Sequence, residues 1–163
     1  SVDDPRPHQA HRVGAVRPVS AVVVEIAEAV TAVLNAATLS QTFTAERAYV
    51  PVHELTDLVD LAVTVVPTSI GVTPLTRHSD DHEYTVDIGV QKRCTPDTTD
   101  ADPLMLLVEE IIDLFRGKTL TGYTAAKCLR VANDPIYVPA HLDDERVFTS
   151  VVTLTFRVAR DQT

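Results

Sequence analysis

The chain has 163 residues, of which 45% are hydrophobic, 5% aromatic and 23% charged. Its 23 acidic residues outnumber 14 Lys and Arg, and the formal net charge is −9. The length suits one domain with an arm rather than two domains, and the charge and the scarcity of aromatic rings exclude a general nucleic-acid binder. No run of residues approaches the ~20 apolar residues of a membrane span, and no signal-peptide pattern is visible, so no membrane partner is expected.

The two cysteines, Cys94 and Cys128, are far apart in the sequence and neither belongs to a C-x-x-C pair. This spacing excludes the common zinc and thioredoxin-type patterns. The sequence predicts two separate free thiols, and a single disulfide is the alternative.

Residues 1 to 18 are predicted to form an extended N-terminal arm. They contain three prolines, three arginines and two histidines, with little apolar periodicity. Such a segment cannot bury enough surface to fold alone, so it is either a disordered tail or a strap that orders on a partner subunit. Residues 19 to 163 are predicted to form a single α+β domain.

Two helices follow from periodicity. From Val19 to Ala37, polar positions recur at helical spacing and the remaining residues form a wide apolar face, which predicts burial on two sides, for instance against a sheet and a neighbouring subunit. The second helix is predicted to begin with Asp102 as N-cap and Pro103 as first residue, and to end at the sequence Arg116-Gly117-Lys118.

The strands are predicted from β-branched and aromatic runs and from alternation. A polar turn, Ser79-Asp80-Asp81-His82, is expected between two of them, and the piece from Val52 to Asp60 is either a helical turn or a loop. Together with the two main helices, these strands predict an α+β fold, with a mostly antiparallel sheet of five to seven strands and the helices packed on it. The expected strands are Phe43 to Val50, Leu61 to Val66, Ile70 to Arg77, Tyr84 to Lys92, Cys128 to Asn133 and Phe148 to Val158.

No catalytic motif is visible, so no catalytic residue, cofactor site or metal site is predicted and the chain is not expected to be an enzyme. A charged turn is expected around His141, Asp143, Asp144 and Glu145, where possible metal ligands are closely spaced, but a metal site is not favoured. The densest polar cluster is expected at the hairpin tip, where it is a solvated tip, a metal site or, as the candidate functional role, a partner-contact loop: Arg77, His78, Asp80, Asp81, His82 and Glu83.

Several stretches resemble small virion proteins of long-tailed bacteriophages. They are Phe43 to Pro51, Leu61 to Pro67, Tyr84 to Lys92 and Phe148 to Val158, and the order of elements is similar too. The pattern covers about residues 19 to 160 and is similar to that of the tail terminator, or tail-completion, family of neck proteins.

The resemblance implies a structural protein of the virion, assembled in the host cytoplasm as a hexameric ring. Such a ring caps the tail tube, stops its polymerisation and offers a surface to the head connector. The implied partners are therefore other copies of the chain, the tail-tube protein and the head–tail connector or adaptor. The strand from Phe148 to Val158 is a candidate tube-facing or inter-subunit element, and the arm is a candidate strap on an adaptor or a sheath-side neighbour.

The resemblance also gives the acidic composition a role, because DNA would pass through the lumen without specific binding. Acidic residues are then expected to outnumber Lys and Arg on the lumen wall, so that phosphates are repelled. The alternatives within structural proteins are a head–tail adaptor or a tail-tube subunit. The alternative from another class is a small cytoplasmic α+β enzyme or ligand-binding module.

Overall fold

Five strands join into one mixed sheet in the order β1-β2-β3-β5-β4. The structure is a computed structural model, and it describes residues 20–50 and 60–161. Strand β1 is parallel to β2, and the other neighbours are antiparallel. The predicted α+β class is confirmed, and the elements are α1 (Val22–Ala36), β1 (Ala45–Arg47), β2 (Ala62–Pro74), β3 (Ser79–Arg93), α2 (Thr98–Phe115), β4 (Lys127–Ala132), α3 (Pro139–Asp144) and β5 (Val147–Asp161).

The core lies between the sheet and the two main helices. Along β3, Tyr84, Val86, Ile88 and Val90 are all buried on the helix-facing side, which confirms the alternation predicted for this strand. Strand β5 runs beside β3 over its whole length and buries Phe156 opposite Tyr84. Branched and aromatic side chains pack well on a pleated surface, so this central pair holds the hydrophobic centre of the sheet.

Helix α1 is buried on two sides, as its wide apolar face predicts. One side packs on β1, β2 and β3. On another side the connector between α2 and β4 approaches closely, because a Cβ added at Gly122 would lie 3.5 Å from that of Ala29. Part of the second covering is therefore supplied by the same chain, and not by a neighbouring subunit as the sequence alone suggested.

Helix α2 begins one turn earlier than predicted. Its N-cap is Asp97, whose side chain accepts a hydrogen bond from the backbone N–H of Asp100 at 2.9 Å. Pro103 then lies inside the helix, where its missing N–H leaves the carbonyl of Thr99 without the usual partner. The predicted start at Asp102 was wrong because Asp97 satisfies the first free N–H groups of an earlier turn. The predicted end is confirmed, with Gly117 in the left-handed region at φ 68°.

Strands β1 and β2 differ most from their predicted bounds. Strand β1 has three residues instead of the eight expected from Phe43 to Val50. Strand β2 does not end at Pro67 but continues to Pro74, with a register shift between Pro67 and Ser69. Thr68 occupies this bulge and donates its hydroxyl to the carbonyl of Thr85 at 3.1 Å. A proline is tolerated here because β2 pairs only with β3 beyond this point among the described residues, so no second ladder needs its N–H.

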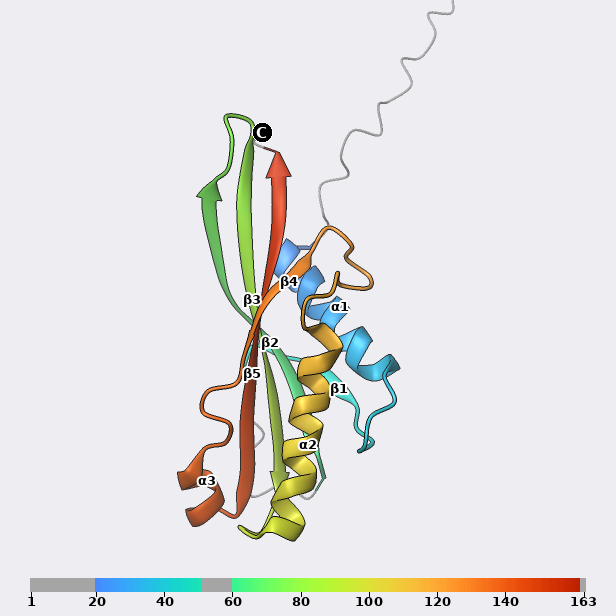
Figure 1. Cartoon of the computed structure of the whole chain (residues 1–163), viewed down its shortest axis with the longest axis vertical. Coiled ribbons are helices and arrows are strands. Elements are labelled where there is room, and N and C mark those ends of the chain that lie inside the picture. Colours follow the sequence, from blue (N-terminus) through green and yellow to red (C-terminus); the bar gives the residue numbers. More distant parts are fainter. Residues whose placement is uncertain (1–19, 51–59, 162–163) are drawn as a thin grey trace, which may run out of the picture.

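The outer half of the sheet extends beyond the helices. Figure 1 shows the β2–β3 hairpin and the end of β5 projecting together at the top, while α2 and α3 lie toward the opposite end. The short helix α3 occupies the stretch for which only a charged turn was predicted. The predicted arm, its boundary at residue 18 and the ambiguous piece from Val52 to Asp60 lie outside the described residues, apart from Asp60 itself.

Candidate interaction surface

The tip of the β2–β3 hairpin is built by residues 75–78, not by the predicted turn at residues 79–82. The carbonyl of Ser79 accepts hydrogen bonds from the backbone N–H groups of Leu75 at 3.1 Å and Thr76 at 3.0 Å. The hydroxyl of Thr76 accepts from the N–H of His78 at 3.2 Å and of Ser79 at 3.0 Å. Thr76 thus organises the turn, and Ser79 already belongs to β3 because its backbone pairs back across the hairpin.

The six predicted site residues therefore separate into two groups. Arg77 and His78 lie on the exposed tip. The other four lie within β3, where consecutive side chains point to opposite faces of the sheet. They are Asp80, Asp81, His82 and Glu83. The structure does not bring all six to one loop, because a strand divides a continuous polar run between two faces.

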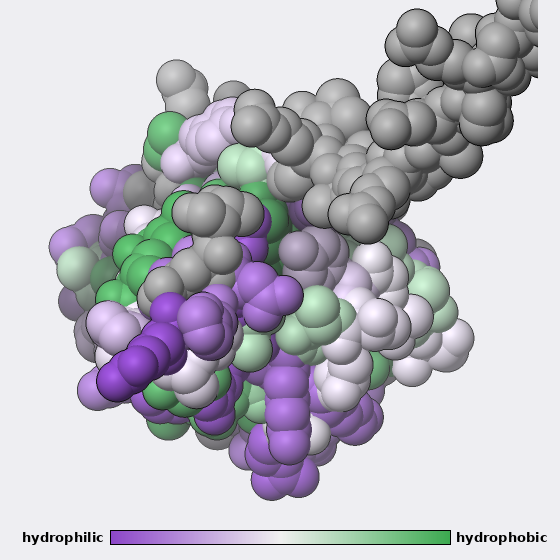
Figure 2. Space-filling model, turned by 90° about the horizontal axis from the view of Figure 1, so that it is seen from above, coloured by the Kyte–Doolittle hydropathy of each residue, from purple (hydrophilic) through white to green (hydrophobic). Residues whose placement is uncertain are grey.

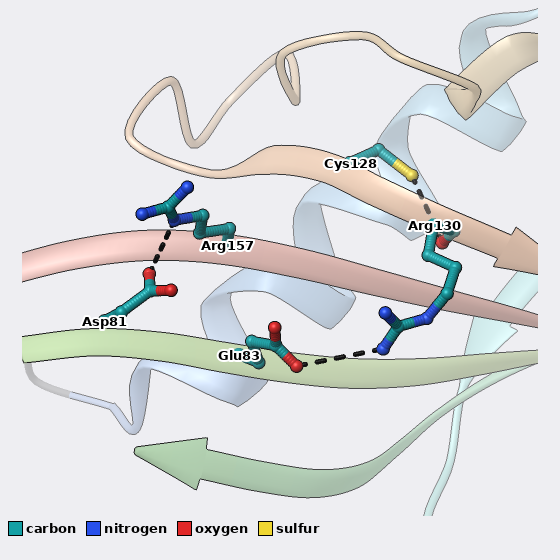
Figure 3. A network of polar contacts seen from close by, with 5 residues as sticks. All are labelled: Asp81, Glu83, Cys128, Arg130 and Arg157. Atoms are coloured by element: carbon teal, nitrogen blue, oxygen red, sulfur yellow. Dashed lines mark hydrogen bonds and ion pairs between the residues drawn. The ribbon is translucent and has the colours of Figure 1, made fainter. Parts of the chain in front are cut away.

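On the face away from the helices, two ion pairs cross the outer half of the sheet (Figure 3). Arg157 of β5 donates through Nε to Asp81 at 2.7 Å, and the Asp81 side chain is only 18% exposed. Arg130 of β4 reaches over β5 to Glu83 at 3.8 Å. The two ion pairs thus connect β3, β4 and β5 on the polar face of the sheet. The paired residues are far apart in the sequence, and only the strand order brings them together.

On the helix-facing side, a polar cluster surrounds the hydroxyl of Tyr84. His82 Nδ1 lies 3.1 Å from this hydroxyl, with the two rings stacked at 5.9 Å, and Arg160 donates to it at 3.3 Å. Burial raises the pKa of the nearby Tyr123 hydroxyl, and the carboxylate of Glu25 raises it further. The ring of Tyr84 packs in the core while its hydroxyl meets two polar partners.

The outer half of β2 is an open sheet edge. Strand β1 stops where Ala48 donates to the carbonyl of Val65 at 2.9 Å, so from Val66 to Pro74 the described residues supply β2 with a partner on one side only. Since the carbonyl of Ser79 points toward β2, the alternation of an antiparallel ladder directs the N–H and C=O groups of Ile70 and Val72 away from β3. Within residues 20–50 and 60–161, no strand pairs with these groups.

The same edge exposes large apolar side chains. Ile70 is 55% exposed, Val72 54% and Leu75 49%. In the view from above (Figure 2), a green hydrophobic area lies on the left of the molecule, the side on which Figure 1 has the outer half of β2. Open backbone groups beside exposed branched residues form a surface that a partner strand can cover. The sequence signal for it was the alternation of Ile70 and Val72 with small residues.

Strand β5 lies in the interior of the sheet, between β3 and β4. It pairs with β3 along its length and with β4 from Thr153 to Arg157. Its backbone is paired on both sides from Thr153 to Arg157, so strand pairing with another subunit is closed there. The inter-subunit role of residues 148–158 stays a prediction. The side chains on its helix-free face stay available for contact.

Reactive groups do not converge in the described part of the chain. Cys94 and Cys128 are free, as predicted, and both are buried. Burial raises the pKa of both thiols, which disfavours the nucleophilic thiolate. Among residues 20–50 and 60–161, no three His, Cys, Asp or Glu side chains are placed to hold a metal ion. In the same part, no helix has the length and apolarity to span a bilayer.

No family model and no curated protein matches the chain. A chain from a solved structure described as "Virion of native gene transfer agent (GTA) particle" is similar, with a TM-score of 0.44 and 13% identity over 87% of this chain and 96% of that chain. A similarity of this size does not assign the chain to a family.

Proposed function

We propose that the protein is a structural component of a bacteriophage virion, a tail terminator whose ring caps the tail tube and joins it to the head connector. The observation that carries this proposal is the open edge of β2, where Ile70, Val72 and Leu75 are exposed beside backbone groups that no described strand pairs. A long, apolar, unpaired edge is a liability for a monomer, and assembly into an oligomer covers it. The role is stoichiometric binding without turnover.

A ring requires two different surfaces on each copy, because in a head-to-tail contact one surface of a copy binds the other surface of its neighbour. The sheet offers two edges of different character. The first is the outer half of β2, and the second is the region of β4 and the segment after it, where Leu129 is 49% and Ile136 48% exposed. Apolar residues on both edges favour a heterologous contact between neighbouring copies.

In this arrangement the helix-free face of the sheet faces the lumen. Asp81 and Glu83 lie on that face with their partners Arg157 and Arg130, so these pairs contribute little net charge. Asp87 lies on the same face, and its Oδ1 atom has no hydrogen-bond partner among the described residues. We expect acidic residues to outnumber Lys and Arg on the complete wall, so that DNA passes without being held. A basic lumen in a particle map contradicts this expectation.

A head–tail adaptor or a tail-tube subunit uses the same open edge, and the position of the protein in a particle map separates these from a terminator. A small enzyme or ligand-binding module is the alternative from another class. It requires a cavity in which polar groups converge on a ligand. A tightly bound small molecule or metal in the purified protein favours this reading.

The test is the oligomeric state of the full chain. Multi-angle light scattering is expected to give a species of about six copies of the 17.8 kDa chain, either alone or on addition of tail tubes. The double variant Ile70→Lys/Val72→Lys is expected to lose the ring, because two charges then occupy the edge while the side chains remain outside the core.

The matched control is Leu106→Lys, which places a charge on a side chain of α2 that is 50% exposed and lies away from β2. This variant is expected to keep the ring. Rings that survive the edge variant contradict the role of β2. A protein that is monomeric in solution and absent from purified virions contradicts the proposed function as a whole.

A further inference from the structure

A second apolar surface lies at the end of the molecule opposite the hairpin. It is a groove of about 340 Å³ between the first turns of α2 and the helix α3, which we call the α2–α3 groove. Figure 1 places both helices toward the lower end, away from the hairpin. Its apolar lining comes from Ala101 and Met105 of α2, Leu142 of α3, Tyr137 and Phe148.

The groove is held open by contacts within the chain. The ring of Tyr137 stacks on Phe148 with centroids 6.3 Å apart, yet Tyr137 stays 38% exposed. The backbone N–H of Val138 donates to the carbonyl of Thr149 at 2.9 Å, and His141 Nδ1 lies 2.9 Å from the hydroxyl of Thr149. Helix α3 is thereby anchored on β5, and a ligand need not reorganise it before binding.

Acidic residues surround this apolar floor. Asp97 and Asp102 line the groove, and Asp143 lines the adjoining hollow beside Tyr137 and Leu142. The Asp97 carboxylate already caps α2. Asp102 and Asp143 are exposed, and no described residue forms an ion pair with either. The surface therefore fits an apolar segment flanked by cations, because opposite charges around an apolar centre set the register of a contact.

The chain itself contains such a segment. Between Pro5 and Val19 there are three arginines and no acidic residue, in a chain where acids outnumber Lys and Arg. Within this stretch, Arg12 and Arg17 flank the apolar residues Val13 and Val16. These residues belong to the 19 that precede the described part of the chain. Arg17 lies three residues and Arg12 eight residues before Ser20, so this segment reaches at most about 29 Å from the start of the described chain when extended.

We propose that the α2–α3 groove binds the segment from Arg12 to Arg17 of a second copy of this chain. Val13 and Val16 contact the floor formed by Met105, Tyr137 and Leu142, and the two arginines meet Asp102 and Asp143. A second copy is favoured over the same copy because α1, which follows the arm, begins in the upper half of the molecule, whereas the groove lies at the lower end (Figure 1). The contact makes the arm a strap between subunits. It rests on the proposed function in requiring self-association, but not on six-fold symmetry or a place in the virion.

Cysteine cross-linking between two full-length chains of different tag length tests this contact. One chain carries Val16→Cys and the other Ala140→Cys on α3, next to the groove; the natural cysteines are buried. A mixed dimer is expected on a non-reducing gel after mild oxidation. The matched control replaces Ala140→Cys with Leu106→Cys on α2, whose side chain is 50% exposed and does not line the groove, and is expected to give little mixed dimer.

Charge reversal sharpens the test. The double change Asp102→Lys/Asp143→Lys is expected to lower the yield of mixed dimer by roughly fivefold, since each exposed ion pair contributes modestly. Arg12→Glu/Arg17→Glu on the partner chain is expected to lower the yield similarly, and combining the two sets should restore it. Glu109→Lys, an exposed change elsewhere on α2, is the control expected to leave the yield unchanged.

Two results overturn the proposal. One is a cross-link that forms only within a single chain carrying both cysteines, which places the arm on its own subunit. The other is a groove whose charge reversal lowers incorporation into particles although no arm cross-link forms, which assigns the groove to a different virion protein. Light scattering reports self-association independently, so loss of the strap and loss of the ring are distinguishable.

Discussion

Arg157 Nε lies 2.7 Å from Asp81 Oδ1, across the outer halves of β5 and β3. The helices α1 and α2 lie on the other face of the sheet (Figure 1), so their apolar side chains do not cover this ion pair. The ion pair is less exposed than the pair between Arg116 and Asp113 at the end of α2, whose side chains are 74% and 65% exposed. The Arg157–Asp81 pair therefore has the better chance of contributing measurable stability.

A double-mutant cycle measures that contribution. The variants Asp81→Ala and Arg157→Ala, alone and together, are expected to give a coupling of about 0.5–1 kcal/mol in the free energy of unfolding. The cycle through Asp113→Ala and Arg116→Ala is the control and is expected to give a coupling close to zero. Urea unfolding followed by circular dichroism measures both. Equal couplings in the two cycles contradict the difference in screening inferred from exposure.

The start of α2 is tested by removing each of two candidate caps. Asp97→Ala is expected to lower the free energy of unfolding by about 1 kcal/mol, because the N–H of Asp100 then loses its acceptor. Asp102→Ala is expected to change it by less than about 0.5 kcal/mol, because this side chain is exposed within the first turns. A larger loss at Asp102 than at Asp97 places the cap where the sequence alone suggested.

The contrast between core and edge is tested by truncating one residue of each. Phe156→Ala is expected to cost about 3–5 kcal/mol, since this side chain is completely buried between β3 and β4. Val72→Ala is expected to cost less than about 0.5 kcal/mol in the isolated chain, because its side chain is half exposed. Denaturant titration of the monomer decides. A large effect of Val72→Ala there indicates that its side chain is buried within the chain.

The thiols of Cys94 and Cys128 are expected to react slowly with Ellman's reagent at pH 8. Burial raises the pKa of both thiols in the folded chain, so the thiolate fraction at this pH is smaller than in the unfolded chain. The same protein in urea is the control and should release two equivalents rapidly. Fast, stoichiometric reaction of the native protein is the outcome that contradicts this prediction.

The fold class could be predicted from the sequence, because the periodicity of apolar residues in a helix or strand shows which side chains are buried. The alternation from Tyr84 to Val90 and the wide apolar face of residues 22–36 both record which side chains meet the core. Element bounds were less accessible. Pro67 ends a strand by local rules, but an edge position and the bulge at Thr68 let β2 continue. Asp97 and Asp102 are equally good caps in sequence, and only folding selects between them.

The interaction surface was only partly predictable. Its polar run from Asp80 to Glu83 is evident in the sequence, yet the register of the hairpin moved the turn to residues 75–78 and divided that run between two faces. The partners of Asp81 and Glu83 are distant in sequence, so no local pattern could assign them. The open edge of β2 depends on where β1 stops, which is a tertiary property.

The sequence by itself determined the acidic charge, the α+β class, the two main helices and the absence of a recognisable catalytic motif, because these follow from composition and from local periodicity. Tertiary structure decided which strand edge remains open, which face carries the ion pairs of Arg157 and Arg130, and which ends of the helices form a groove. Those features depend on long-range pairing, since side chains far apart in the sequence meet only after the sheet order β1-β2-β3-β5-β4 is established. The physical reason is that burial is encoded residue by residue, whereas register and edges arise only between elements.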